Sequence, residues 1–240
     1  MRTTWKSFSK KPSLTFLLSL TFLFLFSGSV YGDDWQDGWD AYDRKDFKEA
    51  VSLWKPLAEQ GDAYTQFNLG QLYRQGRGVP QDYKEAVKWN RLSAEQGYAK
   101  AQYNLGNKYA EGKGVPQDYK EAVRLYRLSA EQGDAYAQYI LGLMYYEGKG
   151  VPQDYKEAVK WYRLTAEQGN ALAQYNLGVM YHNGQGVLQD YALAHMWLNL
   201  CGSTGNEDCV EKRNIIEKKM SPSQIEEAQR LARNWKPTKK

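Results

Sequence analysis

The apolar positions along the chain repeat with a period of 36 residues. The blocks 82–117, 118–153 and 154–189 align without insertions, a looser copy covers 46–81, and a degenerate copy starts at Asp190. Within each full block, apolar and small residues recur at helical spacing in two stretches, and each stretch ends at a glycine. A fixed period of this length predicts a solenoid, because one unit is too small to bury its apolar face and must stack on its neighbours.

The first stretch of each block predicts a helix with a defined start and end. In the block 82–117, Asp82 is a suitable N-cap, and Glu85 follows three residues later, which is the spacing of a capping box. Gly97 then provides a C-terminal stop.

The second stretch predicts a helix that packs closely on its partner. Leu105 and Tyr109 lie four residues apart on its apolar side, and Gly106 stands in its middle. A glycine inside a helix costs about 1 kcal/mol relative to alanine, so its recurrence indicates a contact that leaves no room for a Cβ. The same position is occupied elsewhere by Gly70, Gly142 and Gly178. Two antiparallel helices per block, joined by a GKGVPQ-type connection, predict an all-α, superhelical solenoid of helix pairs.

The strings AQYNLG, GKGVPQDY and EAVKWYRLTAEQG resemble the Sel1-like repeat family, which is related to the tetratricopeptide repeats but has a longer inter-helix loop. The resemblance covers roughly residues 35–235. It implies an α/α superhelix with roles such as envelope complex assembly, signalling or host interaction. In such superhelices the first helix of each pair lines the concave face, and we carry that placement over to this chain by aligning its repeats.

The repeats and their ends divide the chain into four parts. Residues 1–32 are predicted to be a signal peptide, and 33–60 a shortened, tetratricopeptide-like capping pair of helices without the GKGVPQ connection. Four Sel1-like repeats are expected over 61–204, and closing helices with a basic tail over 205–240. Ser221 is the expected N-cap of the last helix.

The leader has the three regions of a secretory signal. Its basic residues are Arg2, Lys6, Lys10 and Lys11. The apolar run 14–26 is short for a membrane span, and the mostly small residues of 27–32 suit cleavage after Gly32. We therefore expect a periplasmic or secreted protein with no stable membrane insertion after cleavage, and the alternative is a leader retained as an anchor.

Charge gives no indication of a nucleic-acid partner. The whole chain has a formal net charge of +4, and the leader carries four basic and no acidic residues, so the remainder is neutral. A neutral chain offers no broad basic field to nucleic acid or to an anionic membrane surface. The tail has a local basic run, Lys236, Lys239 and Lys240, which is expected to be solvated.

The two cysteines are predicted to form a disulfide. In the repeat register, Cys201 takes a position at the end of one helix that faces the position of Cys209 at the start of the next. An exported protein favours such a bond. A metal site made from these cysteines with His182 and His195 has no zinc-like spacing, so we predict no metal and no cofactor, and we place His195 on a helix surface.

The sequence shows no catalytic constellation. Glu85 is explained by capping and Glu95 by a solvated helix end. A catalytic pair of carboxyls needs two different environments, whereas a repeated surface pattern gives every copy the same one. No Ser–His–Asp arrangement has support from the spacing. We therefore predict no catalytic residues and no enzymatic activity.

Columns that differ between repeats are free to carry specificity, whereas identical columns hold the stack together. On the helices assigned to the concave face, the differing columns lie beside a near-constant aromatic column and its neighbouring amides. Together they give a groove of tyrosine and asparagine side chains, which suits an extended peptide or a partner's helix. The predicted groove residues are Tyr64, Phe67, Asn68, Arg74, Lys100, Tyr103, Asn104, Tyr136, Tyr139, Tyr146, Asn176 and His182. The alternative interpretation is that some of these columns are second-layer packing.

The observations favour a monomeric, exported scaffold that binds a protein or peptide partner in its concave groove. A second hypothesis is a β-lactam-binding or β-lactam-hydrolysing enzyme, which the resemblance suggests for cysteine-rich Sel1-like proteins, although those carry a cysteine pair in nearly every repeat. A third is a peptidoglycan- or glycan-binding envelope protein, since aromatic grooves also suit sugars. Turnover of nitrocefin would distinguish the second hypothesis, and retention on purified peptidoglycan the third.

Overall fold

The structure is a computed structural model that describes residues 34–238, and all regular elements in this range are helices. The predicted signal peptide, residues 1–32, lies outside the described residues. A first helix covers 34–43 of the described range. It is followed by α2 (Phe47–Glu59), α3 (Ala63–Gln75), α4 (Tyr83–Glu95), α5 (Ala99–Glu111), α6 (Tyr119–Glu131), α7 (Ala135–Glu147), α8 (Tyr155–Glu167), α9 (Ala171–Asn183), α10 (Tyr191–Gly202), α11 (Glu207–Glu217) and α12 (Pro222–Asn234). The predicted all-α solenoid of helix pairs is confirmed.

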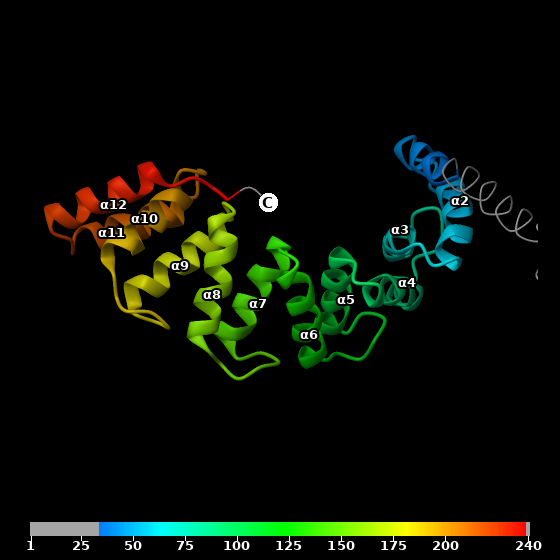
Figure 1. Cartoon of the computed structure of the whole chain (residues 1–240), viewed down its shortest axis with the longest axis horizontal. Helices are drawn as coiled ribbons and strands as arrows, with labels where there is room; N and C mark the ends of the chain where they lie inside the picture. The colour runs from blue at the N-terminus through cyan, green and yellow to red at the C-terminus, as the bar shows by residue number, and fades with distance from the viewer. Residues whose placement is uncertain (1–33, 239–240) are drawn as a thin grey trace, which may run out of the picture.

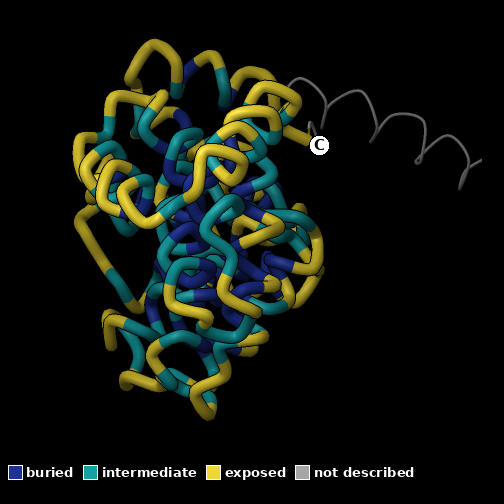
Figure 2. Tube along the Cα trace, turned by 90° about the vertical axis from the view of Figure 1, so that its left-hand side faces the viewer, coloured by how far each residue is buried: buried dark blue, intermediate teal, exposed yellow. Residues whose placement is uncertain are grey.

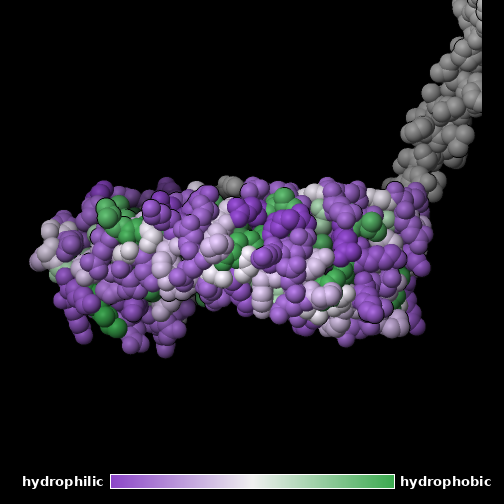
Figure 3. All heavy atoms as spheres, turned by 90° about the horizontal axis from the view of Figure 1, so that it is seen from below, coloured by the Kyte–Doolittle hydropathy of each residue, from purple (hydrophilic) through white to green (hydrophobic). Residues whose placement is uncertain are grey.

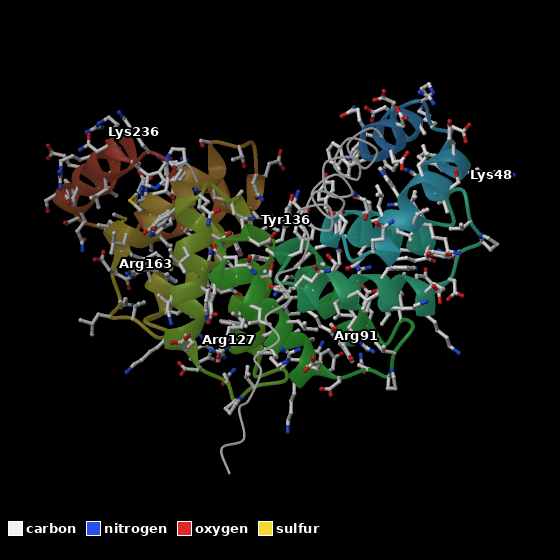
Figure 4. The ribbon with its side chains drawn as sticks, turned by 45° about the vertical axis from the view of Figure 1, so that its right-hand side comes forward. Lys48, Arg91, Arg127, Tyr136, Arg163 and Lys236 are labelled. Atoms are coloured by element: carbon white, nitrogen blue, oxygen red, sulfur yellow. A yellow bond between two sulfur atoms is a disulfide. The ribbon has the colours of Figure 1, made fainter. Side chains whose placement is uncertain are left out.

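The helices follow one another along an arc, with α2 near one end and α12 at the other (Figure 1). Each helix packs mainly on its neighbours in the chain, and α12 returns to pack on α10. We call α3, α5, α7 and α9, which hold equivalent places in the repeats, the inner row, and α4, α6 and α8 the outer row. In Figure 4, Tyr136 of α7 lies on the inner side, between the two ends of the arc, whereas Arg91 of α4 and Arg127 of α6 lie along the outer side.

Burial follows this arrangement. The buried segments run through the middle of the molecule and the exposed ones along its edges (Figure 2). The face seen from below in Figure 3 is mostly hydrophilic, with separate hydrophobic spots. On the outer helices, Leu92, Leu128 and Leu164 are 37–38% exposed, one in each repeat. Within residues 34–238, no helix combines the length and apolarity needed to cross a membrane.

Glycines in the inner helices allow the close packing predicted from the sequence. A Cβ added at Gly106 of α5 would lie 2.8 Å from a ring carbon of Tyr126 on α6. A Cβ at Gly142 of α7 would lie equally close to Tyr162 on α8. These distances are shorter than van der Waals contact, so any larger residue would push the two helices apart.

A ladder of buried glutamines joins consecutive repeats. Gln102 is 4% exposed, and its side-chain Nε2 donates to the Ala94 carbonyl at 3.2 Å while its Oε1 accepts from Gln132 at 2.8 Å. The same two bonds recur at Gln66 and at Gln138. Because buried amides need hydrogen-bond partners, this ladder fixes how one repeat sits on the next.

The N-caps of the outer helices are present, but the predicted capping box is not complete. The Asp82 carboxylate accepts the main-chain N–H of Glu85 at 3.1 Å. Its own N–H donates to the Tyr73 carbonyl at 3.0 Å instead of to the Glu85 side chain, so the second half of that prediction is wrong. A complete capping box occurs at the start of α12, between Ser221 and Gln224.

The closing helices are joined by the predicted disulfide. Cys201 near the end of α10 and Cys209 near the start of α11 are bonded, with their Cα atoms 5.8 Å apart. The prediction that His195 lies on a helix surface is wrong. This residue is 3% exposed, and its Nε2 lies 3.1 Å from a carboxylate oxygen of Glu217, because α11 packs on α10 and covers that side.

Lys108 is a buried charge in a column that is otherwise apolar. It is 5% exposed, and its Nζ lies 5.2 Å from the centroid of the Tyr83 ring. Burial lowers the pKa of the Lys108 amine, and this effect is partly opposed by nearby Glu111. The equivalent positions in the other repeats hold Leu72, Met144 and Met180.

Replacing Lys108 with methionine is expected to stabilise the protein by about 1 kcal/mol at neutral pH, because a buried charge is replaced by the residue that the next two repeats have at this position.

The lowered pKa of Lys108 also predicts the direction in which stability changes with pH. The folded wild type binds this proton less tightly than the unfolded chain, so its stability rises as the pH approaches 10.5 from below. Urea unfolding over this pH range should show the rise for the wild type and a smaller one for the variant. A variant less stable than the wild type at neutral pH would contradict the prediction.

Candidate binding groove

Two tyrosines from outer helices form the floor of the inner surface. Tyr126 of α6 and Tyr162 of α8 are 2% and 1% exposed and lie against the inner-helix glycines. The Tyr126 hydroxyl donates to Asn107 Oδ1 at 2.8 Å. Burial raises the pKa of both hydroxyls, with smaller contributions from Tyr103 and Tyr139 respectively, so both remain neutral donors. The sequence prediction missed these residues because it considered the inner helices alone.

At the amino-terminal end, two predicted groove residues are packing residues. Tyr64 has ring centroids of Trp35, Trp39 and Tyr98 within 5.8–6.1 Å, and Phe67 packs on Tyr98 at 5.2 Å. Burial, with Tyr64 as a second cause, raises the pKa of the Tyr98 hydroxyl. This end of the inner surface is therefore an aromatic cluster that joins the first helix to α3.

The amides and basic groups near that end are largely engaged. Arg74 Nε donates to Gln71 Oε1 at 2.8 Å, and Asn104 Nδ2 donates to the Lys100 carbonyl at 3.0 Å. Asn68 Nδ2 is buried without a partner among residues 34–238. Lys100 itself is exposed. These side chains form a polar shoulder beside the aromatic cluster.

The carboxy-terminal half of the inner surface is open and apolar. Tyr136 of α7 is 69% exposed and Leu172 of α9 is 54% exposed. Tyr103 stacks beside Tyr136 at 6.1 Å between ring centroids, and Tyr139 lies over Tyr162 at 5.8 Å. Two pairs of rings therefore lie along this half, one joining α5 to α7 and the other joining α7 to α8.

A hollow of about 220 Å³ opens next to this surface. Its lining combines aromatic, aliphatic and amide side chains with one lysine from the closing helices. The lining residues that matter here are Leu143, Tyr146, Tyr175, Asn176, Val179 and Lys212. Tyr146 also packs on Tyr155 at 5.3 Å. Two of the predicted groove residues, Tyr146 and Asn176, therefore meet at one hollow.

Helix α11 extends the groove beyond the predicted residues. Ile215, one 36-residue step after Val179, is 42% exposed, and Lys212 stands one step after Asn176. His182 of α9 packs on Tyr191 with ring centroids 5.5 Å apart. Burial lowers the pKa of the His182 imidazole, and Lys219 and Lys212 lower it further, which favours its neutral form. Continuing the repeat register through the closing helices would have revealed these positions.

The structure divides the predicted site into two groups. One group, on the open carboxy-terminal half, is Tyr103, Tyr136, Tyr139, Tyr146, Asn176 and His182. The other group, in the aromatic cluster and its polar shoulder, is Tyr64, Phe67, Asn68, Arg74, Lys100 and Asn104. No group of three or more His, Cys, Asp or Glu side chains that could hold a metal ion occurs in the part of the chain that the structure describes. The inner surface as a whole is suited to contacts with a chain that presents apolar side chains and backbone amides.

The Sel1 repeat family profile matches residues 35–62, 63–98, 99–134, 135–170 and 171–200. The first of these matches is the opening pair that the sequence predicts as a capping unit. The repeat boundaries coincide with the starts of α3, α5, α7 and α9.

Two solved structures are similar over most of the chain. One is a protective antigen present in uropathogenic Escherichia coli strains, with 32% identity and a TM-score of 0.77 over 86% of this chain and 46% of that protein. The other is a Sel1 repeat protein from Oxalobacter formigenes, with 35% identity and a TM-score of 0.70 over 73% of this chain and 72% of that one. This chain thus spans just under half the length of the E. coli protein. A comparison with curated proteins gives no match.

Proposed function

Because the chain belongs to the Sel1 repeat family, whose members generally mediate protein–protein interaction, we propose that it is an exported, monomeric scaffold that binds a peptide or protein partner on its inner surface. The open carboxy-terminal half, from Tyr136 to Ile215, is the proposed contact region. Export is supported by the predicted leader and by the disulfide of the closing helices.

The observation that carries this proposal is the grouping of exposed apolar side chains on neighbouring inner helices. Tyr136, Leu172 and Ile215 belong to α7, α9 and α11 and are 69%, 54% and 42% exposed, and the hollow at Tyr146 and Asn176 is lined from α7, α9 and α11 as well. Contiguous exposed apolar surface of this kind marks interaction sites. The tyrosines can anchor a partner's side chains, and the amides can bond its backbone.

The test compares matched inner and outer variants. Peptides selected on the wild type from a random displayed library are expected to bind Tyr136→Ala/Leu172→Ala at least tenfold more weakly, which corresponds to about 1.4 kcal/mol or more. They should bind Leu128→Ala/Leu164→Ala as tightly as the wild type. All four residues are exposed, so neither pair should unfold the chain. Equal binding by the two variants, or loss with the outer pair alone, would remove the inner surface from the proposal.

A further inference from the structure

The carboxy-terminal tail folds back onto the outer row. Thr238 donates its main-chain N–H and its hydroxyl to the Glu167 carbonyl at the end of α8, at 2.8 and 3.1 Å. Pro237 lies over Gly169, where an added Cβ would be 3.9 Å from the proline Cβ. Trp235 packs edge-on against Trp197 of α10, with ring centroids 6.4 Å apart. In Figure 1 the last described residues after α12 reach the end of α8.

These contacts fall on positions that recur in every repeat. The three residues touched by the tail are Glu167, Gly169 and Trp197. Three periods earlier stand Glu59, Gly61 and Trp89, and all of them line a hollow of about 880 Å³ between α2 and α4. Two periods earlier stand Glu95, Gly97 and Leu125, and all of them line a hollow of about 350 Å³ between α4 and α6. The tail therefore occupies one member of a row of equivalent sites.

The hollow between α2 and α4, which we call the first outer hollow, is the larger of the two. In the smaller one, Arg91 reaches across and donates to the Tyr109 hydroxyl at 2.9 Å. Lys55 takes the position of Arg91 in the first outer hollow and makes no hydrogen bond to Tyr73 in the described chain. The tail's own site keeps the equivalent bridge, from Arg163 to the Tyr181 hydroxyl, so the bridge does not exclude such a segment, and its absence at Lys55 leaves more room in the first outer hollow.

The first outer hollow also presents an unpaired carbonyl beside an apolar wall. Trp89, which is 4% exposed, forms part of this wall. The Glu59 carbonyl, equivalent to the one that binds Thr238, accepts no hydrogen bond from any donor among residues 34–238. Leu92 adds an apolar side chain that is 38% exposed. An unpaired carbonyl beside apolar side chains fits an extended segment, which offers a main-chain N–H and apolar side chains.

We propose that the first outer hollow binds an extended segment of a partner protein with the chemistry of this tail, namely an aromatic residue followed two positions later by proline and then by threonine or serine. The aromatic ring packs on Trp89, the proline covers Gly61, and the next main-chain N–H donates to the Glu59 carbonyl. A basic residue between the aromatic residue and the proline, like Lys236, meets the carboxylates of Glu59 and Glu95 at the rim. This site is separate from the inner surface and is an additional docking point on the scaffold.

The test uses the full-chain protein and a fluorescent peptide of residues 229–240, QRLARNWKPTKK. Fluorescence anisotropy should show saturable binding that weakens at least tenfold when the peptide carries Trp235→Ala, and likewise when the protein carries Leu92→Arg. Leu164→Arg is the matched control, because Leu164 is 38% exposed like Leu92, occupies the same repeat position and does not line the first outer hollow. This control and Tyr136→Ala/Leu172→Ala should both bind the peptide like the wild type.

Several results would overturn the proposal. Equal binding by Leu92→Arg and Leu164→Arg would place the peptide elsewhere, and loss of binding in the Tyr136→Ala/Leu172→Ala protein would place it on the inner surface. Binding seen only after deletion of residues 235–240 would show that the tail's own site is the one that accepts such a segment. Concentration-dependent self-association that Trp235→Ala abolishes would identify a second copy of this chain, not another protein, as the occupant.

Discussion

Replacing Gly150 with alanine is expected to destabilise the protein by about 3 kcal/mol. This is more than the same change should cost at a connecting glycine that has no backbone atom close by. Gly150 lies in the connection between α7 and α8 with a φ of +76°. An added Cβ would lie 2.3 Å from the carbonyl oxygen of Tyr119, the first residue of α6. Backbone cannot move aside as a flexible side chain can, so the connection must lift off the preceding helix pair.

The control separates this clash from the cost of the backbone angle alone. Gly97 has a φ of +88°, and a Cβ added there would have no other heavy atom of the described chain within 4 Å. Gly97→Ala is therefore expected to cost only the left-handed strain, about 1 kcal/mol. For a chain of this size, the melting temperature should fall by roughly 6–12 °C for Gly150→Ala and by roughly 2–4 °C for Gly97→Ala. Similar shifts for the two variants would show that the close approach contributes nothing.

The close packing of Gly150 on the preceding helix pair also explains why the repeat could be recognised from the sequence. Each connection carries a glycine in the same place, and each of them packs on the first residue of an earlier outer helix. The contact needs the same residue, at the same spacing, in every copy. Local requirements of this kind appear in the sequence as identical columns, so the helices, their order and the close approach at Gly106 could all be predicted.

The burial of individual side chains in the groove could not be predicted in the same way. Tyr64 and Tyr136 occupy one column, yet Tyr136 is 69% exposed while Tyr64 is packed against Trp35 and Trp39. The difference comes from the first helix, which covers only the repeat beside it. A column therefore predicts which face a side chain occupies, but its burial depends on what lies at each end of the stack.

The burial of His195 could have been predicted from the repeat register, because the same column holds Val87, Val123 and Val159, which are 4–5% exposed. The contact of the carboxy-terminal tail could not. The tail reaches α8 through a bond between residues 71 positions apart, and this contact does not repeat, so no comparison between blocks could indicate it. The same applies to the asymmetry between Lys55 and Arg91, which becomes meaningful only when the two hollows are compared in space.

The second large effect is expected at the disulfide. Removing it should destabilise the protein by roughly 2–3 kcal/mol, as the loop-entropy relation gives for a bond with a sequence separation of 8. The bond matters because α11 has little else to hold it: its buried residues are Cys209 and Ile216. Through α11 the disulfide also supports the groove positions Lys212 and Ile215.

The best variant is Cys201→Ser/Cys209→Ala, because the same columns hold Ser93 and Ala101 in a complete repeat. The variant side chains are therefore ones that a complete repeat already packs at these two positions, and only the covalent bond is lost. Chemical unfolding should show the loss for this variant without reductant, and the wild type should lose as much when dithiothreitol is added. Because repeats contact only their neighbours, hydrogen exchange should quicken in α11 while α5 to α7 stay protected. An unchanged unfolding midpoint, or a reductant effect on the variant itself, would show that the bond does not hold the closing helices in place.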